Sequence, residues 1–185
     1  SVISGTATAS TTATTSTNAG SSTISASAGN LSATNYSFTT VDGTLTINPL
    51  AVSLSGSRAY NGNTDIGGSD LVVSNVVGAD TVTLSGTGTL AGANAGTQTI
   101  SGFGSLALSN NNYTLTGGTG NATIDKVVLT VTADDKTRTY GSSNPSLTQT
   151  ITGFVNSETI SVISGTATAS TTATTSTNAG SSTIS

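Results

Sequence analysis

The sequence contains no cysteine, histidine, methionine or tryptophan. Without cysteine there can be no disulfide, and without cysteine and histidine the chain lacks the usual ligands of zinc and other transition metals. Histidine is also the commonest general base, so the many serine and threonine hydroxyls lack a plausible activating partner. We therefore expect a protein that is not an enzyme, with no catalytic residues, no cofactor-binding residues and no metal-binding residues.

Charged residues are also scarce, at 6% of the chain with a net charge of −4. No basic stripe is present, so we expect no nucleic-acid partner. No segment approaches the roughly 20 consecutive apolar residues that span a bilayer, so we expect no membrane insertion within this segment. Glutamate occurs once and lysine twice, which leaves almost no charge pairs to support helices.

The residues that are abundant favour strands. Threonine, valine and isoleucine fit a pleated surface, and apolar residues alternate with polar ones at Leu50, Val52 and Leu54. The same alternation recurs over residues 127–131. A disordered linker rich in serine and threonine is the rival interpretation, but it needs no such alternation. The pattern predicts an all-β chain.

The first 25 residues return unchanged as residues 161–185, a shift of 160 positions. Identity over this length indicates a tandem array of near-identical modules, of which this chain is one stretch. Its neighbouring repeats, carried on the same polypeptide, are then its expected partners.

A second, more diverged period of about 80 residues lies inside the first. Its landmarks recur in order: Arg58-Ala59-Tyr60 matches Arg138-Thr139-Tyr140, Asn94-Ala95-Gly96 matches Asn18-Ala19-Gly20, and Asn112-Tyr113 matches Asn35-Tyr36. Three sections follow: residues 1–49 as the C-terminal part of one domain, 50–125 as a related complete domain, and 126–185 as the N-terminal part of the next copy of the first.

Each unit should be a small β-sandwich-like domain, and short spacers such as Pro49-Leu50 should join the units into a rod. A β-grasp-like sheet is the alternative if residues 63–70 or 142–148 hold a short helix. Gly117-Gly118 is expected to form a hairpin turn. The predicted core residues are Ile24, Tyr36, Ile47, Ile100, Tyr113, Ile124 and Leu129.

Two small groups of charged residues remain as candidates for chemistry. Asp134-Asp135 is the only pair of adjacent carboxylates, and a solvated turn is favoured there over a Ca²⁺ site because Ca²⁺ requires six or more oxygen ligands. Arg58 and Arg138 lie two residues before a tyrosine in equivalent places. We expect each to pair with an acid or to stack on an aromatic ring of its own unit.

The residues of these units resemble a known pair of domain families. Residues 137–147 (TRTYGSSNPSL), Gly153-Phe154 and residues 43–47 (GTLTI) are similar to the MBG domain. Arg58-Ala59-Tyr60-Asn61-Gly62, followed by Gly78-Ala79-Asp80, resembles the related YDG domain, with Asn61 where aspartate is usual. The resemblance implies tandem MBG and YDG domains of large bacterial surface adhesins of the filamentous-haemagglutinin-like, two-partner-secreted type.

From this resemblance and the repeats we expect a structural stalk or filament segment of a giant repetitive bacterial cell-surface adhesin, located outside the cell. Its role would be reach and mechanical continuity. Two alternatives stay open. One is a self-assembling extracellular fibre subunit completed by strand exchange, whose partners would be other copies in a fibre or biofilm matrix. The other is a glycan-binding adhesin module.

Overall fold

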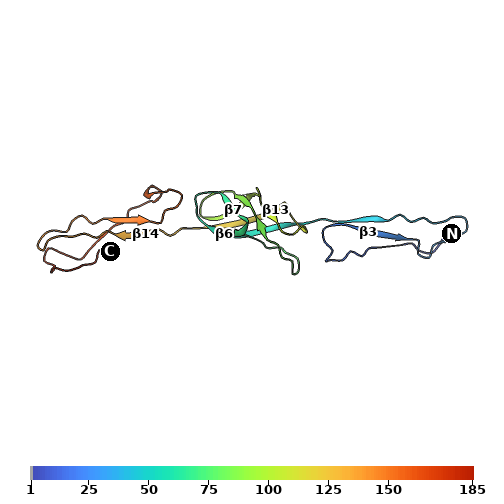
Figure 1. The fold of residues 1–185 in the computed structure, drawn as a ribbon, viewed down its shortest axis with the longest axis horizontal. Helices are drawn as coiled ribbons and strands as arrows, with labels where there is room; N and C mark the ends of the chain where they lie inside the picture. The colour runs from blue at the N-terminus through green and yellow to red at the C-terminus, as the bar shows by residue number, and fades with distance from the viewer. Residues whose placement is uncertain (1) are drawn as a thin grey trace.

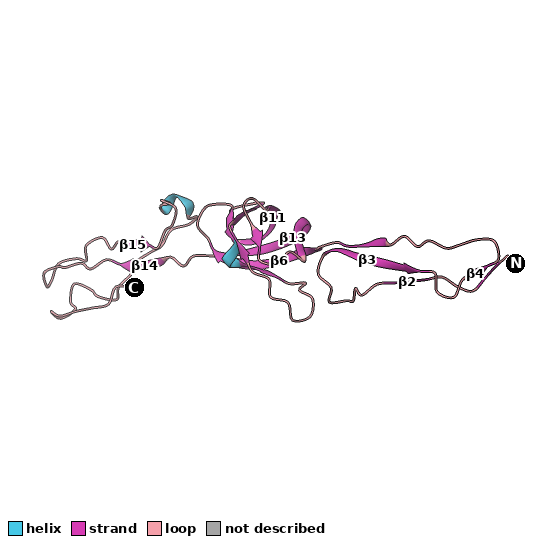
Figure 2. Ribbon diagram, turned by 45° about the vertical axis from the view of Figure 1, so that its right-hand side comes forward, coloured by secondary structure: helices cyan, strands magenta, loops and turns pink. Residues whose placement is uncertain are grey.

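The computed structural model describes residues 2–185, which form three sections along one long axis (Figure 1). We call residues 2–49 the N-terminal lobe, residues 50–125 the central unit and residues 126–185 the C-terminal lobe. Apart from two short 3-10 helices, η1 (Gly68–Asp70) and η2 (Ile160–Val162), the regular structure in this described part is β-strand (Figure 2). The expected all-β fold is confirmed.

The central unit is built on one six-stranded sheet in the order β7-β10-β11-β13-β6-β8. Its strands are β6 (Leu50–Ala59), β7 (Asp65–Gly67), β8 (Leu71–Val73), β10 (Thr87–Leu90), β11 (Gly96–Gly102) and β13 (Tyr113–Asp125). The first and last strands, β6 and β13, pair in parallel, and the other neighbours are antiparallel. A separate ribbon joins β9 (Leu84–Ser85) to β12 (Ala107–Leu108).

This topology bears on the two arrangements expected from the sequence. All six main strands belong to one curled, mixed sheet, with the first and last strands side by side near its centre. The 3-10 helix η1 lies inside the 63–70 segment where the β-grasp-like alternative required a short helix. The central unit is therefore one curled sheet, with a three-residue 3-10 helix in the segment named by this alternative.

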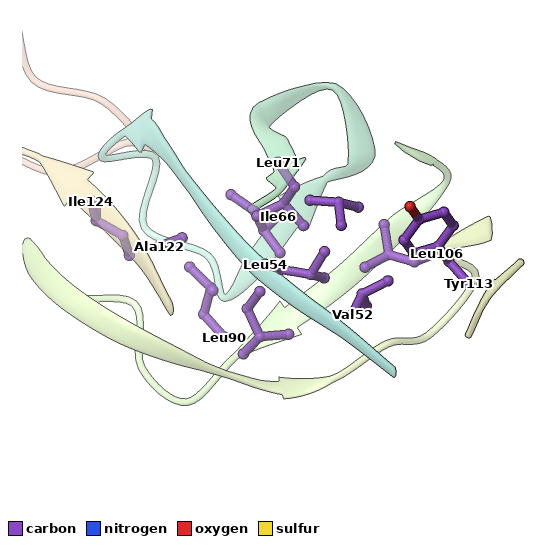
Figure 3. Packing of buried hydrophobic residues seen from close by; sticks show 11 residues of the cluster. Val52, Leu54, Ile66, Leu71, Leu90, Leu106, Tyr113, Ala122 and Ile124 are labelled. Atoms are coloured by element: carbon purple, nitrogen blue, oxygen red, sulfur yellow. The ribbon is translucent and has the colours of Figure 1, made fainter. Parts of the chain in front are cut away.

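The hydrophobic core lies inside the curl of this sheet (Figure 3). Alternation along β6 directs Val52 and Leu54 inward, because successive side chains of a strand point to opposite faces. The predicted core residues Ile100, Tyr113 and Ile124 are buried there. The full buried cluster consists of Val52, Leu54, Ile66, Leu71, Val73, Leu90, Ile100, Leu106, Tyr113, Ala122 and Ile124.

Gly117-Gly118 does not form the hairpin turn expected from the sequence. Both glycines lie within β13, where the pairing with β6 shifts register between Thr114 and Thr119. Gly117 has a φ of 73°, which glycine adopts without a steric penalty. The pair therefore marks a bulge inside one long strand, which local turn signals do not distinguish from a hairpin.

The N-terminal lobe repeats the second half of the central unit. Its strands are β1 (Ile3–Ser4), β2 (Thr8–Ser10), β3 (Gly20–Ser27), β4 (Ser32–Ala33) and β5 (Gly43–Ile47). In β3 and β5, Gly20 is opposite Ile47, just as Gly96 is opposite Ile124 in β11 and β13. The order β2-β3-β5 therefore matches β10-β11-β13.

The C-terminal lobe repeats the first half of the central unit. Its two strands, β14 (Thr130–Ala133) and β15 (Gln149–Thr152), place Val131 opposite Ile151. In the central unit, β6 and β8 place Leu54 opposite Val73 in the same way. The two related units thus share strand order and register, as the half-period predicts.

The lobes differ from the central unit in burial. None of the buried hydrophobic residues identified in the described chain lies in either lobe. Ile24, Ile47 and Leu129 are only half-buried and Tyr36 is 64% exposed, so their predicted core positions are wrong for this chain. The reason is that each lobe holds only part of the strand set, and its apolar face has no complementary strands to cover it.

The exact sequence repeat is in part a structural repeat. Ser170 and Ser185 exchange both backbone hydrogen bonds, in the place where Ser10 is opposite Ser25. In both copies the hydroxyl of Thr17, or of Thr177, accepts from the backbone N–H three residues earlier at 2.8 Å. Residues 162–185 therefore repeat part of the conformation of residues 2–25, since the turn before Thr17 and the positive φ values of Gly5 and Gly20 recur at Thr177, Gly165 and Gly180. Strands β1, β2 and β3 have no counterpart in residues 162–185, where only the Ser170–Ser185 pair of the β2–β3 ladder forms.

Candidate functional site

The most specific contact between sections joins the central unit to the C-terminal lobe. Tyr60 follows β6 directly, and its hydroxyl donates a hydrogen bond to Glu158 Oε1 at 2.5 Å. The Tyr60 N–H donates to the Asp125 carbonyl at 2.8 Å, which fixes Tyr60 beside the end of β13. The single glutamate of the chain is thus used at a junction between units.

The hydrogen bond to Glu158 raises the pKa of Tyr60 above its ordinary value of 10.0, and desolvation and the negative charge of Glu158 add to the rise. All three effects disfavour the phenolate. Tyr60 therefore stays protonated at neutral pH and remains available as the donor.

The loop that carries Glu158 also packs closely against the central unit. A Cβ atom at Gly62 would lie 2.1 Å from Asn156 Nδ2 and 2.9 Å from Asn156 Cβ, and the positive φ of 78° at Gly62 strains any residue other than glycine. Asn156 and Ser157 have positive φ values of 54° and 59°, a conformation that costs energy for residues other than glycine. The surrounding contacts hold this loop in its strained shape against residues 60–62.

An open groove of about 520 Å³ lies beside this junction. Tyr60, Asn94 and Ala95 line it from the central unit, and Val127, Val155 and Glu158 are among the residues that line it from the C-terminal lobe. Its walls combine apolar side chains with the Glu158 carboxylate.

The junction at the other end of the central unit uses different residues. Asn112 Oδ1 accepts a hydrogen bond from the Ala19 N–H at 2.8 Å. Asn112 Nδ2 donates to Asn18 Oδ1 at 3.0 Å. Both sections that flank the central unit are therefore bonded to it by side chains as well as by the continuous backbone.

The two arginines do not pair with acids or stack on aromatic rings, contrary to expectation. Arg58 donates to Asn61 Oδ1 at 2.7 Å and to the Asn63 carbonyl at 2.6 Å, which closes the loop after β6. Arg138 donates to the Ser142 carbonyl at 3.1 Å and also to the Thr174 carbonyl. A guanidinium has five donors and suits loops with several free carbonyl groups.

Asp134 binds hydroxyl groups across a strand pair. Its carboxylate accepts from Thr148 Oγ1 at 2.5 Å and from Thr150 Oγ1 at 2.7 Å, which ties the end of β14 to β15. The Thr148 bond, followed by the Thr150 bond and the charge of Lys136, lowers the Asp134 pKa, against an opposing effect of desolvation. The carboxylate therefore strengthens a hairpin.

Within residues 2–185, no three side chains of histidine, cysteine, aspartate or glutamate gather in a way that could hold a metal ion. In the same part of the chain, neither helical segment has the length and hydropathy needed to cross a bilayer.

The landmarks of these junctions are visible in the sequence, but the contacts between them are not. Tyr60, Asn94 and Asn112 all lie in motifs that recur between the two units. The pairing of Tyr60 with Glu158 spans 98 residues and depends on how two units dock, which local patterns do not encode. The signal that could have found it is the single glutamate at the position where the central unit carries Asp80.

The fold and its junctions define a class of protein, in which small all-β units follow one another in tandem and consecutive units are joined by side-chain hydrogen bonds. A comparison with protein-family profiles assigns residues 43–123 to the YDG domain and residues 129–185 to the MBG domain of the YGX type. The chain therefore carries YDG and MBG domains in tandem, as the sequence resemblance indicated. Comparisons with curated proteins and with solved structures gave no match.

Proposed function

We propose that this chain is a stalk segment of a giant repetitive bacterial cell-surface adhesin, and that it provides reach and mechanical continuity outside the cell. The observation that carries this proposal is the junction between the central unit and the C-terminal lobe. The Tyr60–Glu158 hydrogen bond and the close packing of Gly62 on Asn156 restrict the angle between consecutive units.

Further features support a stalk. Only four residues separate β13 from β14 and two separate β5 from β6, so little free linker is available for bending. Side-chain bonds at both ends of the central unit add to this restraint. The MBG and YDG domains are themselves consistent with an extracellular adhesin-like module.

The surface composition suits the same role. Serine, threonine and asparagine hydrate the surface without relying on ion pairs, so shape and stability should change little with salt. The absence of cysteine makes the protein independent of redox state. We propose a structural protein with no enzymatic activity, whose main partners are the neighbouring repeats.

The test is the growth of length with repeat number. Proteins with one, two and three copies of the 160-residue period should be compared by small-angle X-ray scattering. A stalk predicts equal increments of the maximum dimension for each added period. A flexible chain of units would instead grow roughly as the square root of repeat number. Square-root growth would contradict the stalk.

A fibre subunit is the second candidate, and the incomplete burial of the two lobes favours it. Ile24 and Leu129 are half-buried, and strands from another chain could cover them. This candidate predicts that the mass measured by light scattering rises with concentration. A stalk with several periods should instead stay monomeric, because neighbouring periods on the same polypeptide complete each lobe.

A further inference from the structure

Tyr113 of the central unit is the counterpart of Tyr36 and shows which contacts this tyrosine makes in a complete unit. Tyr113 Oη donates to Asp80 Oδ2 at 2.8 Å and accepts from the Val77 N–H at 2.7 Å. Its ring is 4% exposed and packs with the core (Figure 3). The preceding residue, Asn112, bonds to Asn18 and Ala19 of the preceding section. Asn112-Tyr113 therefore anchors the last strand to its own unit and to the unit before it.

The C-terminal lobe contains the same binding site for a tyrosine hydroxyl. Glu158 is the counterpart of Asp80, and Val155 is the counterpart of Val77. The backbone N–H of Glu158 donates to the Val155 carbonyl at 3.0 Å, just as the backbone N–H of Asp80 donates to the Val77 carbonyl at 3.1 Å. Val155 and Glu158 both line the groove of about 520 Å³.

The groove also contains the contact for the residue before that tyrosine. Asn94-Ala95 lines its other wall and is the counterpart of Asn18-Ala19, the pair that binds Asn112. Both halves of the Asn112-Tyr113 site are thus present in one open groove.

We propose that this groove is the docking site for a second copy of residues 26–49, with Tyr36 as its anchor and Asn35 bound to Asn94 and Ala95. In the N-terminal lobe this tyrosine is 64% exposed, because that lobe lacks the counterparts of Val77 and Asp80. Residues 161–185 repeat residues 1–25 in sequence, and Ser170 pairs with Ser185 as Ser10 pairs with Ser25, so a segment with the sequence of residues 26–49 attached after Ser185 starts from the same backbone pair that precedes Ala26.

Glu158 then serves two tyrosines at once. It already accepts from Tyr60 of the unit before, and it would accept from the docked copy of Tyr36 within its own unit. The inference rests on the proposed stalk, because docking completes the MBG unit and fixes the junction at the same time. Closure of each unit would thereby be coupled to its attachment to the preceding unit.

The test appends residues 26–49 to Ser185 of the full chain and measures amide hydrogen exchange by nuclear magnetic resonance. We expect the Val155 N–H to exchange about tenfold more slowly than in the original chain, the upper end of what one hydrogen bond contributes. The amides of β14 should become protected with it. Unchanged exchange at Val155 would overturn the proposal.

Three matched variants separate the anchor from general packing. An appended copy with Tyr36→Ala should protect neither Val155 nor β14. An appended copy with Tyr36→Phe should protect β14 but leave the Val155 N–H exchanging as in the original chain, because the acceptor oxygen is gone. Glu158→Gln should lower the protection given by the natural copy. Equal protection of Val155 by all appended copies would contradict a tyrosine anchor.

Amides of β11 and β13 in the central unit serve as the internal reference for folding. Scattering from the same samples distinguishes this inference from the proposed function. A rigid extended shape without protection at Val155 would remove the docking site and leave the stalk. A shape that bends freely would count against the stalk itself.

Discussion

Ile124 and Ile47 occupy equivalent positions in the two related units, yet their burial differs. Ile124 is 1% exposed inside the central core, whereas Ile47 is half-buried in the N-terminal lobe. Truncation of Ile124 to alanine should lower the free energy of unfolding by about 2–5 kcal/mol, because it removes buried apolar surface and leaves a cavity. Thermal or denaturant unfolding of the full chain measures this loss.

Ile47→Ala is the matched control for this prediction. Its side chain lacks the strands that would enclose it, so neighbouring groups and water can adjust, and the expected loss is below about 1 kcal/mol. Equal losses at the two positions would mean that the N-terminal lobe is as well packed as the central unit, which the burial pattern contradicts.

At the scale of single residues, the sequence correctly predicted the burial of Val52 and Leu54 on one face of β6 and of Ile100, Tyr113 and Ile124, whereas Leu50 on the same face is 41% exposed. Strict alternation of apolar and polar residues is sufficient for that. The sequence prediction failed for Tyr36, because the burial of this side chain depends on strands that the N-terminal lobe does not contain. The prediction for the two arginines failed because most of their acceptors are backbone carbonyls, which no sequence motif displays.

At the scale of elements, the β14–β15 pair should be sensitive to acid. The pKa of Asp134 is lowered in the folded state, mainly by the Thr148 and Thr150 hydroxyls, so folding favours the ionised form. Its contribution is present above the unfolded value of 3.8 and is lost as pH falls through the folded pKa. Hydrogen exchange of residues 149–152 between pH 2 and 5 should show this loss.

Asp134→Asn provides the comparison for this element. Near neutral pH the β14–β15 pair should be less stable in the variant than in the original chain, because the charge-assisted hydrogen bonds are gone. The stability of this pair should also change less on acidification in the variant. An identical pH dependence in both proteins would show that other carboxylates govern the acid response.

The Tyr60–Glu158 junction should open at alkaline pH. Because the Tyr60 pKa is raised above 10.0, its contribution is fully present below that pH and is lost as pH rises through the folded pKa. The pKa of Tyr113 is also raised, mainly by desolvation. Alkaline titration of the whole chain therefore reports the ionisation of both tyrosines. Ultraviolet absorbance should be titrated against pH for the original chain and for Tyr60→Phe. The difference between the two curves should show one tyrosine that ionises above pH 10. A Tyr60 signal centred at or below pH 10 would contradict the hydrogen bond.

The parallel pairing of β6 with β13 is the element-scale feature that the sequence did not predict directly. These strands are the first and last of the central unit, and local periodicity says nothing about which distant strands pair. From sequence, a β-grasp-like sheet is only an alternative, which depends on a short helix over residues 63–70 or 142–148. Similarly, the Gly117-Gly118 bulge resembles a turn when only neighbouring residues are considered.

At the scale of the whole molecule, the repeats carried most of the information available from sequence. The exact copy of residues 1–25 predicted a repeated conformation, and the half-period predicted matching registers in the two units. Close succession of the units could be predicted from the short spacers, but the contacts between them could not, because they depend on the positive φ values at Asn156 and Ser157 and on the fit of Gly62. These features exist only once both units have folded.

The central claim is that consecutive units are held at a fixed angle, and a distance distribution across one junction tests it most directly. Because the chain has no cysteine, Thr97→Cys and Thr132→Cys place two spin labels at exposed positions on either side of the junction. Asn111→Cys with Thr97→Cys gives a reference pair at exposed positions inside the central unit, because Asn111 precedes the start of β13 and Thr97 is opposite Thr123 near its end. Double electron–electron resonance should yield one narrow peak across the junction, about as wide as the reference peak. A distribution several times broader than the reference would contradict a stalk of interlocked units.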